Sequence, residues 1–197
     1  MHLCGRTEPV TIVAPKGAKE VIDTTFELTG NHIEYPIEWT EMDFEEGEQR
    51  VFENGKCTVD AFRIDHTVPT YGFRVTTKHT HLTSHLSPLA YAYCCDTAYD
   101  ESILPHIAGA DLLCLECTFA NELGDLAEQR KHLTAGQAGL LAQKAGVRQL
   151  LLTHLSARYK EPDVLLQQAR EEFAECIMAT DGMRLEITAN GTKMSEL

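Results

Sequence analysis

The feature that most constrains the fold of this chain is a change in the pattern of its short segments near residue 89. Before that point, an Asn54-Gly55 turn signal precedes an alternating strand over 57–64, and another strand is predicted over 71–77. Beyond it, predicted strands over 91–95, 112–117 and 149–153 alternate with predicted helices over 101–107, 134–145 and 162–173. Antiparallel hairpins followed by β-α-β units predict an α/β fold, in which helices cover a mixed sheet.

Local signals fix the limits of some of these elements. Thr134 and Gln137 have the spacing of a capping box at the start of the 134–145 helix, and Gly146 is its predicted stop. The remaining predicted elements are a strand over 10–14, a helix over 18–28, and strands over 177–180 and 185–188.

Length and charge narrow the class of protein. A chain of 197 residues is predicted to form a single domain over 1–197, because this is an ordinary domain size. Folding at this size buries roughly 70% of the surface that the unfolded chain exposes. The net charge of −13 argues against generic nucleic-acid binding but leaves room for one local basic site. No apolar run reaches the ~18–20 residues of a membrane helix, and a signal-peptide core is absent from the first residues. We therefore expect a cytoplasmic protein with no membrane partner.

The seven cysteines raise the question of disulfides or zinc. Their odd number argues against a disulfide framework. Cys114 and Cys117 form a C-x-x-C pair, but they lie in an apolar run typical of a buried strand, and no second pair stands at zinc-finger spacing. We interpret the cysteines as reduced thiols in a cytoplasmic core.

Polar side chains capable of binding metal follow four of the predicted strands. His66 comes after the first of them, with Asp96, Glu116 and His154 at the ends of the later ones. Open α/β sheets keep their sites at the carboxyl ends of strands. Any one of these residues alone is more typical of a solvated loop or a helix cap. Four in succession favour a hydrolytic metal site, because imidazole and carboxylate are ligands of zinc, manganese and iron.

Other histidines lie off the strands. His132 precedes a helix, where an imidazole is ordinarily exposed; beside a metal-bound phosphate it would instead protonate a leaving oxygen, with Glu116 orienting its ring. His79, His81 and His85 resemble a metal motif, but they stand in a polar loop without a carboxylate. We expect them to capture metal only adventitiously.

Motifs along nearly the whole chain resemble those of ribonuclease Z and its relatives with the metallo-β-lactamase fold. The matching segments are Gly5-Arg6-Thr7, Asp65-His66-x-x-Pro69-x-Tyr71-Gly72, Asp96-Thr97, Glu116-Cys117-Thr118-Phe119, His132-Leu133-Thr134 and Thr153-His154-Leu155-Ser156-Ala157-Arg158-Tyr159. They occur in the order that the family shows. The resemblance implies an αββα sandwich and a hydrolase that cleaves phosphodiester bonds, such as a tRNA 3′-processing endonuclease.

The resemblance also implies roles for individual residues. His66, Asp96 and His154 match metal ligands, with Asp96 as the carboxylate that bridges two zinc ions; manganese is an alternative metal. His132 matches a proton donor whose partner is Glu116. Ser156 and Arg158 match residues that approach the substrate phosphate. In the mechanism of the family, a metal-bound hydroxide attacks phosphorus while the proton donor serves the departing oxygen.

Two departures from the family pattern carry expectations of their own. The signature motif His-x-His-x-Asp-His is absent, so we expect a domain that lacks its first strands and its first metal motif. Three ligands would then be too few for a stable pair of ions, and an uncovered sheet would favour a homodimer. Only about 20 residues join Arg74 to Asp96, too few for the tRNA-binding arm of the family. An arm-less small-molecule phosphodiesterase, another metallo-hydrolase, or an inactive half-domain that acts as an interaction module remain alternatives.

Overall fold

The computed structural model describes residues 5–31, 33–78 and 87–196. The chain forms two compact units, Met1–Glu45 and Glu46–Leu197. Within these described ranges, none of the helices has the length and apolar character needed to cross a membrane. The predicted histidine loop with His79, His81 and His85 lies outside the described residues.

The first unit is a β-α-β motif. Strand β1 (Val10–Pro15) and strand β2 (Ile37–Met42) pair in parallel, and helix α1 (Ala18–Thr29) connects them. Gly17 and Gly30, with positive φ values of 89° and 66°, flank the helix. A residue without Cβ adopts this conformation at little cost, so the two glycines set where the helix begins and ends. The predictions of β1 and α1 are confirmed.

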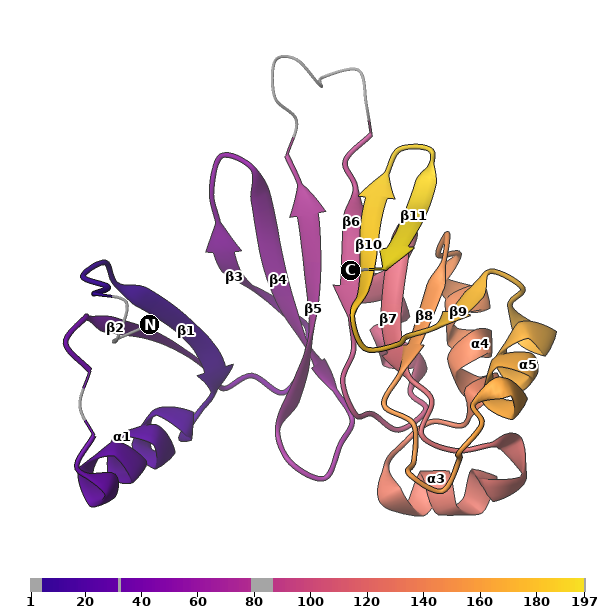
Figure 1. Ribbon diagram of the computed structural model, residues 1–197, viewed down its shortest axis with the longest axis horizontal. Coiled ribbons are helices and arrows are strands. Elements are labelled where there is room, and N and C mark those ends of the chain that lie inside the picture. The colour runs from indigo at the N-terminus through magenta and orange to yellow at the C-terminus, as the bar shows by residue number, and fades with distance from the viewer. Residues whose placement is uncertain (1–4, 32, 79–86, 197) are drawn as a thin grey trace. The chain divides into compact units, whose positions relative to one another are not determined.

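The second unit begins with four antiparallel strands, drawn from purple to magenta in Figure 1. They are β3 (Glu48–Glu53), β4 (Cys57–Ile64), β5 (Thr70–Thr77) and β6 (Ala90–Tyr93). The side chain of Asn54 accepts hydrogen bonds from the backbone N–H groups of Lys56 and Cys57, which closes the predicted hairpin turn. Asparagine suits this position because its side chain replaces a backbone turn partner.

Three further strands extend the same sheet in parallel. They are β7 (Leu112–Glu116), β8 (Leu150–Thr153) and β9 (Cys176–Met178), and the full order is β3-β4-β5-β6-β7-β8-β9. Because β5 is antiparallel to both β4 and β6, strands β4, β6, β7 and β8 all run in one direction. Their carboxyl ends therefore lie at the same edge of the sheet. The predicted mixed α/β sheet is confirmed.

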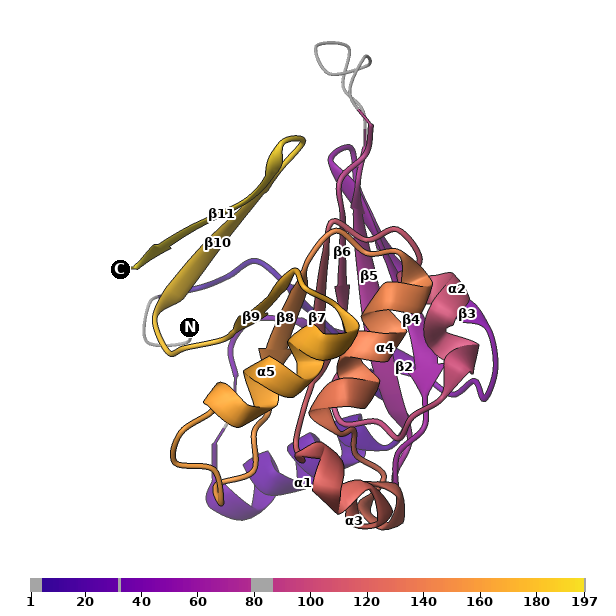
Figure 2. The same cartoon turned by 90° about the vertical axis from the view of Figure 1, so that its right-hand side faces the viewer.

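Helices connect the parallel strands. They are the short turn η2 (Glu101–Ile103) with α2 (Leu104–Ile107), η3 (Asn121–Leu123) with α3 (Gly124–Arg130), α4 (Ala135–Ala145) and α5 (Asp163–Glu172). The predicted capping box of Thr134 and Gln137 is present at the start of α4, and Gly146 ends the helix with a positive φ of 61°. Figure 2 shows α4 and α5 side by side in front of the sheet.

The core lies between these helices and one face of the sheet. Leu113, Leu115 and Leu152 are fully buried there against Leu141 and Leu165 of the helices. Burying side chains of this size stabilises the fold by roughly 1.5–3 kcal/mol each. This packing holds the strand ends, and with them the site described below, in fixed positions.

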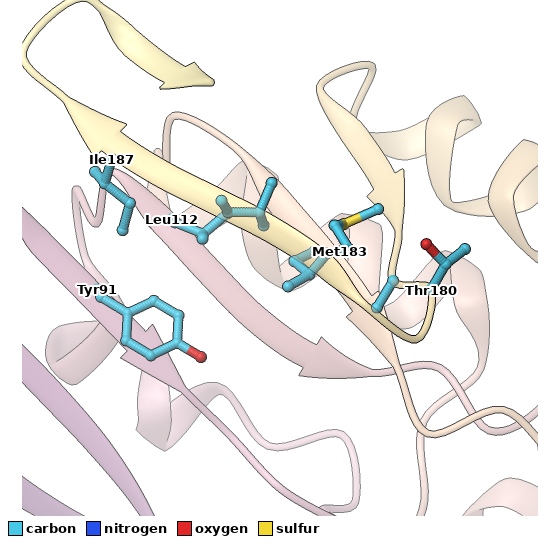
Figure 3. A pocket seen from close by; sticks show the side chains of 8 residues that line it. Tyr91, Leu112, Thr180, Met183 and Ile187 are labelled. Carbon is cyan, nitrogen blue, oxygen red and sulfur yellow. The ribbon is translucent and has the colours of Figure 1, made fainter. Parts of the chain in front are cut away.

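A hairpin of β10 (Met183–Thr188) and β11 (Gly191–Glu196) lies on the opposite face of the sheet. An apolar cavity of about 370 Å³ separates the hairpin from the sheet. In Figure 3, Tyr91 and Leu112 of the sheet lie across from Met183 and Ile187 of β10. Strand periodicity explains this arrangement, because alternate residues of β6 and β7 point to opposite faces.

The cysteines of the described chain are free thiols. Cys94, Cys114, Cys117 and Cys176 are buried. Burial raises the pKa of the Cys117 thiol to about 12, with the neighbouring Glu116 carboxyl adding to the effect. Burial also raises the pKa of Cys176 to about 11. Protonated, buried thiols are poor nucleophiles. The burial of Cys114 and Cys117 confirms their interpretation as core residues.

The packing of α4 on α5 depends on Gly139, and we expect Gly139→Ala to lower the free energy of unfolding by about 1–3 kcal/mol. An added Cβ would lie 2.5 Å from the backbone oxygen of Ala169 and 3.0 Å from Cβ of Glu172. Backbone cannot rotate away as a side chain can, so the two helices must separate. Urea denaturation followed by circular dichroism measures the loss.

Gly124→Ala is the matched control for this substitution. Gly124 opens α3 with a helical φ of −53°, and an added Cβ there meets nothing within 4 Å. The free energy of unfolding of this variant should lie within about 0.5 kcal/mol of the wild-type value, or slightly above it. Equal losses for Gly139→Ala and Gly124→Ala would contradict the role assigned to the helix contact.

Candidate active site

Four side chains from different segments meet at the carboxyl edge of the sheet. Asp96 follows β6, Glu116 ends β7, His154 follows β8, and His132 stands between α3 and α4. One potential ligand atom from each of the four lies within 4.8 Å of the others. The convergence of strand-end residues predicted from the sequence is therefore present in the fold.

Glu116 is the buried anchor of the cluster, with a side chain only 1% exposed. Its Oε1 accepts hydrogen bonds from the Thr97 backbone N–H at 2.8 Å and from Nδ1 of His132 at 2.8 Å. Its Oε2 accepts from the Thr118 hydroxyl at 2.5 Å and from the backbone N–H groups of Thr118 and Leu133. A carboxylate this fully engaged has little capacity left for a metal, so its geometry suits a positioning role.

His132 is oriented by this carboxylate. Because Nδ1–H donates to Glu116, the lone pair of the neutral ring lies on Nε2. The ring also stacks on His154, with centroids 5.4 Å apart, and meets Phe119 edge-on at 6.0 Å. These contacts restrict the ring to one orientation, as a proton donor requires.

His154 combines an unusual backbone with a polar contact. Its φ of 53° lies in the left-handed region, which costs a non-glycine residue of order 1–3 kcal/mol. Its Nδ1 lies 2.9 Å from the Thr118 hydroxyl and 3.3 Å from Oδ1 of Asp96. With the hydroxyl proton given to Glu116, Nδ1 is the donor to Thr118, which leaves Nε2 with its lone pair. Strain of this kind concentrates at functional sites.

His66 reaches the same edge from β4. Its Nδ1 donates to the backbone oxygen of Lys131 at 2.9 Å, and its Nε2 lies 4.0 Å from Oδ2 of Asp96. Lys131 has a positive φ of 54°, and its ammonium group pairs with Asp65 at 2.6 Å. Lys131 thus connects the loop before His132 to the segment that carries His66. Such a carbonyl partner fixes the tautomer that a ligating histidine needs.

The donor set fits a divalent metal. His66, Asp96 and His154 supply two imidazoles and one carboxylate, which zinc and manganese accept. Nε2 of His66 lies 4.0 Å from Oδ2 of Asp96, and Asp96 and His154 each place a ligand atom within 4.8 Å of the other, so small side-chain rotations would bring the three side chains onto one ion. Asp96 is 28% exposed and His154 is 50% exposed on their side chains, which leaves both accessible from solvent.

The two residues predicted to approach a phosphate lie beside the cluster. Arg158 donates from Nε to the Ser156 hydroxyl at 3.0 Å, and its guanidinium lies 5.0 Å from the centroid of the Phe119 ring. The backbone N–H of Ser156 donates to the carbonyl of Thr118. Tyr159 accepts a hydrogen bond from the backbone N–H of Ala120, which fixes the loop that carries both residues.

Three further residues shape the site, and no individual role was predicted for them from the sequence. Thr118 contacts Glu116, His132 and His154 through one hydroxyl, at 2.5, 3.4 and 2.9 Å. Phe119 packs between Arg158 and His132. Thr118 and Phe119 both belong to the motif Glu116-Cys117-Thr118-Phe119, and membership of that motif was the sequence signal that could have identified them. The backbone oxygen of Lys131 contacts His66, and no sequence pattern reports a contact of that kind.

The fold and the site define a class of protein. The family model described as "Beta-lactamase superfamily domain" matches residues 1–155, so the chain belongs to that superfamily. Ribonuclease Z of Borrelia hermsii is 30% identical over 92% of this chain and 71% of its own length. Ribonuclease Z of Ignicoccus hospitalis is 31% identical over 92% of this chain and 71% of its own length. Within the superfamily, the chain is a member of the ribonuclease Z family.

Solved structures agree with this fold. The short form of human tRNase Z superposes with a TM-score of 0.65 at 24% identity, over 76% of this chain and 61% of that chain. The metallo-β-lactamase fold protein YhfI from Bacillus subtilis gives 0.66 at 22% identity, over 87% of this chain and 63% of its own. This chain therefore spans about 60% of the length of those two proteins. The predicted metallo-β-lactamase fold is confirmed.

Proposed function

We propose that this chain is a metal-dependent hydrolase that cleaves phosphodiester bonds in tRNA precursors, as a 3′-processing endonuclease. The observation that carries the proposal is the cluster of Asp96, Glu116, His132 and His154, whose ligand atoms lie within 4.8 Å of one another. The ribonuclease Z relatives, which are 30% and 31% identical to this chain and align with 92% of it, support RNA as the substrate class.

We propose zinc as the metal, with manganese as the alternative, and His66, Asp96 and His154 as the residues that hold it. A metal there would supply Lewis-acid polarisation of the phosphate and activation of a water. The protein's part is to fix the ligands: the carbonyl of Lys131 orients His66, and the hydroxyl of Thr118 orients His154.

The chain's own residues account for the other requirements of the reaction. Attack by a water oxygen on phosphorus forms one P–O bond and releases a proton of that water to solvent. It also breaks the bond to the leaving ribose oxygen, which needs a proton. His132, protonated on Nε2, gives that proton, while Glu116 holds Nδ1–H and stabilises the imidazolium. Arg158 and Ser156 bind the phosphate oxygens, which accept charge-assisted hydrogen bonds.

The setting of the enzyme is part of the same proposal. We place it in the cytoplasm as a homodimer, with both compact units forming one metallo-β-lactamase-like domain. Support for a dimer comes from β3, one of the two edge strands of the seven-stranded sheet, where Phe52 is 44% exposed. An edge strand with an exposed aromatic residue favours pairing with another chain.

The test is cleavage of a precursor tRNA that carries a 3′ trailer, by the purified chain supplied with zinc or with manganese. We expect metal-dependent cleavage at one position near the acceptor stem, abolished by a chelator and restored when metal is returned. Gel analysis of end-labelled RNA reads the position and the rate.

A chromogenic phosphodiester assayed in parallel separates the alternatives. Hydrolysis of the small ester without cleavage of precursor tRNA would replace the proposal with a small-molecule phosphodiesterase. Inactivity on both substrates, by a chain that binds metal and unfolds cooperatively, would contradict enzymatic function and favour an interaction module.

A further inference from the structure

A hollow of about 570 Å³ lies beside the candidate site, with His132 in its lining. This volume is within the roughly 300–1,000 Å³ of ligand pockets. Its lining includes two arginines, two histidines and two apolar side chains: Arg130, Arg158, His66, His132, Phe119 and Leu126. Acidic residues are absent from the described lining of this hollow, although the whole chain has a net charge of −13.

Arg130 is the unexplained residue of this group. It is the last residue of α3 and is exposed. Across the described ranges of the chain, its guanidinium has neither a hydrogen-bond partner nor an ion-pair partner, whereas Arg158 is held by Ser156 and Phe119. A cation stabilises the carboxyl end of a helix, which explains an arginine at this position but not its place in the lining of the hollow.

A second hollow of about 610 Å³, also lined by His132, has the opposite character. Asp65 and Glu128 line it, and its one cation, Lys131, is paired with Asp65. His132 lines both hollows, so the site adjoins one basic hollow and one acidic hollow. A polyanion approaching the site is attracted to the first and repelled by the second.

We propose that the hollow with Arg130 binds the RNA strand next to the scissile phosphate, and that Arg130 contacts a neighbouring phosphate. Arg158 contacts the scissile phosphate itself, while Leu126 and the edge of Phe119 form an apolar floor for the adjacent nucleotide. The inference rests on the proposed function, since it assumes an RNA substrate. It adds the side on which the strand leaves the site and an RNA-binding residue outside the matching motifs.

The experiment compares wild type with Arg130→Ala, Arg130→Lys and Arg184→Ala. Arg184 is an exposed arginine on β10 and serves as the matched control for loss of one surface charge. Fluorescence anisotropy of a labelled precursor tRNA gives the dissociation constant at several salt concentrations, with RNA integrity checked on gels. The cleavage rate of the same RNA and of a chromogenic phosphodiester is measured for each variant.

We expect Arg130→Ala to weaken RNA binding about 5–10-fold and to reduce the slope of log affinity against log salt by about 0.7, the value of one single-stranded phosphate contact. Arg130→Lys should keep the slope, because it keeps the charge. Arg184→Ala should change neither quantity, and hydrolysis of the small ester should be the same in all four proteins.

The outcomes separate the two proposals. If Arg130→Ala binds with the slope of the wild type, or if Arg184→Ala loses as much, the hollow is not the path of the RNA. If Arg130→Ala shows the expected loss of affinity but wild type cleaves no RNA, the hollow is an RNA-binding surface and the proposed function is wrong.

Discussion

Asp96→Asn is expected to weaken metal binding by roughly 100-fold or more, with a loss of hydrolysis at least as large. Asp96 supplies the only carboxylate of the proposed ligand set; its Oδ2 lies 4.0 Å from Nε2 of His66 and its Oδ1 lies 3.3 Å from Nδ1 of His154. Asparagine keeps the shape but removes the negative charge that offsets a divalent ion. Plasma emission spectroscopy after dialysis against a mild chelator counts the ions per chain.

Asp181→Asn controls for the loss of one carboxylate elsewhere. Asp181 is exposed in the turn before β10, where a change of charge should leave metal content and stability within error of the wild type. Cobalt substitution adds a spectroscopic readout, since its visible absorption depends on the ligands. Wild-type metal content in Asp96→Asn would contradict the assignment of Asp96 as a ligand.

The sequence predicted most of the sheet because its strands carry strong local signals. The Asn54-Gly55 turn and the capping box of Thr134 both act over a few residues, and both are present in the structure. Strand β2 (Ile37–Met42) was missed, because its alternation is interrupted by polar and acidic residues. Helix α3 (Gly124–Arg130) was missed because it has no side-chain cap at its start.

Part of the candidate site was predictable because the order and direction of the strands decide where their ends lie. Strand direction brings strand-end residues to one edge, so Asp96, Glu116 and His154 follow from the order of elements. The contact of the Lys131 carbonyl with His66 depends on a left-handed backbone and on two segments 65 positions apart. Neither composition nor periodicity encodes such a contact, because it arises only when the fold is assembled.

Glu116→Gln is expected to have the second large effect, a loss of about 2–4 kcal/mol in the free energy of unfolding and a fall of roughly 10²–10⁴ in RNA cleavage. The carboxylate accepts five hydrogen bonds in a place where it is 1% exposed. A glutamine presents one oxygen and one NH₂ group, so at least one buried donor would face another donor. The neutral amide would also no longer offset the positive charge of the His132 imidazolium.

The leaving group of the substrate separates the effect on His132 from a general loss of structure. A p-nitrophenolate leaves readily without a proton, whereas a ribose oxygen needs one, so Glu116→Gln should lose far more activity on RNA than on a p-nitrophenyl ester. Glu171→Gln, on the exposed side of α5, should leave both activities and the stability unchanged. Equal losses on the two substrates in folded Glu116→Gln would show that Glu116 acts on the whole site rather than through His132.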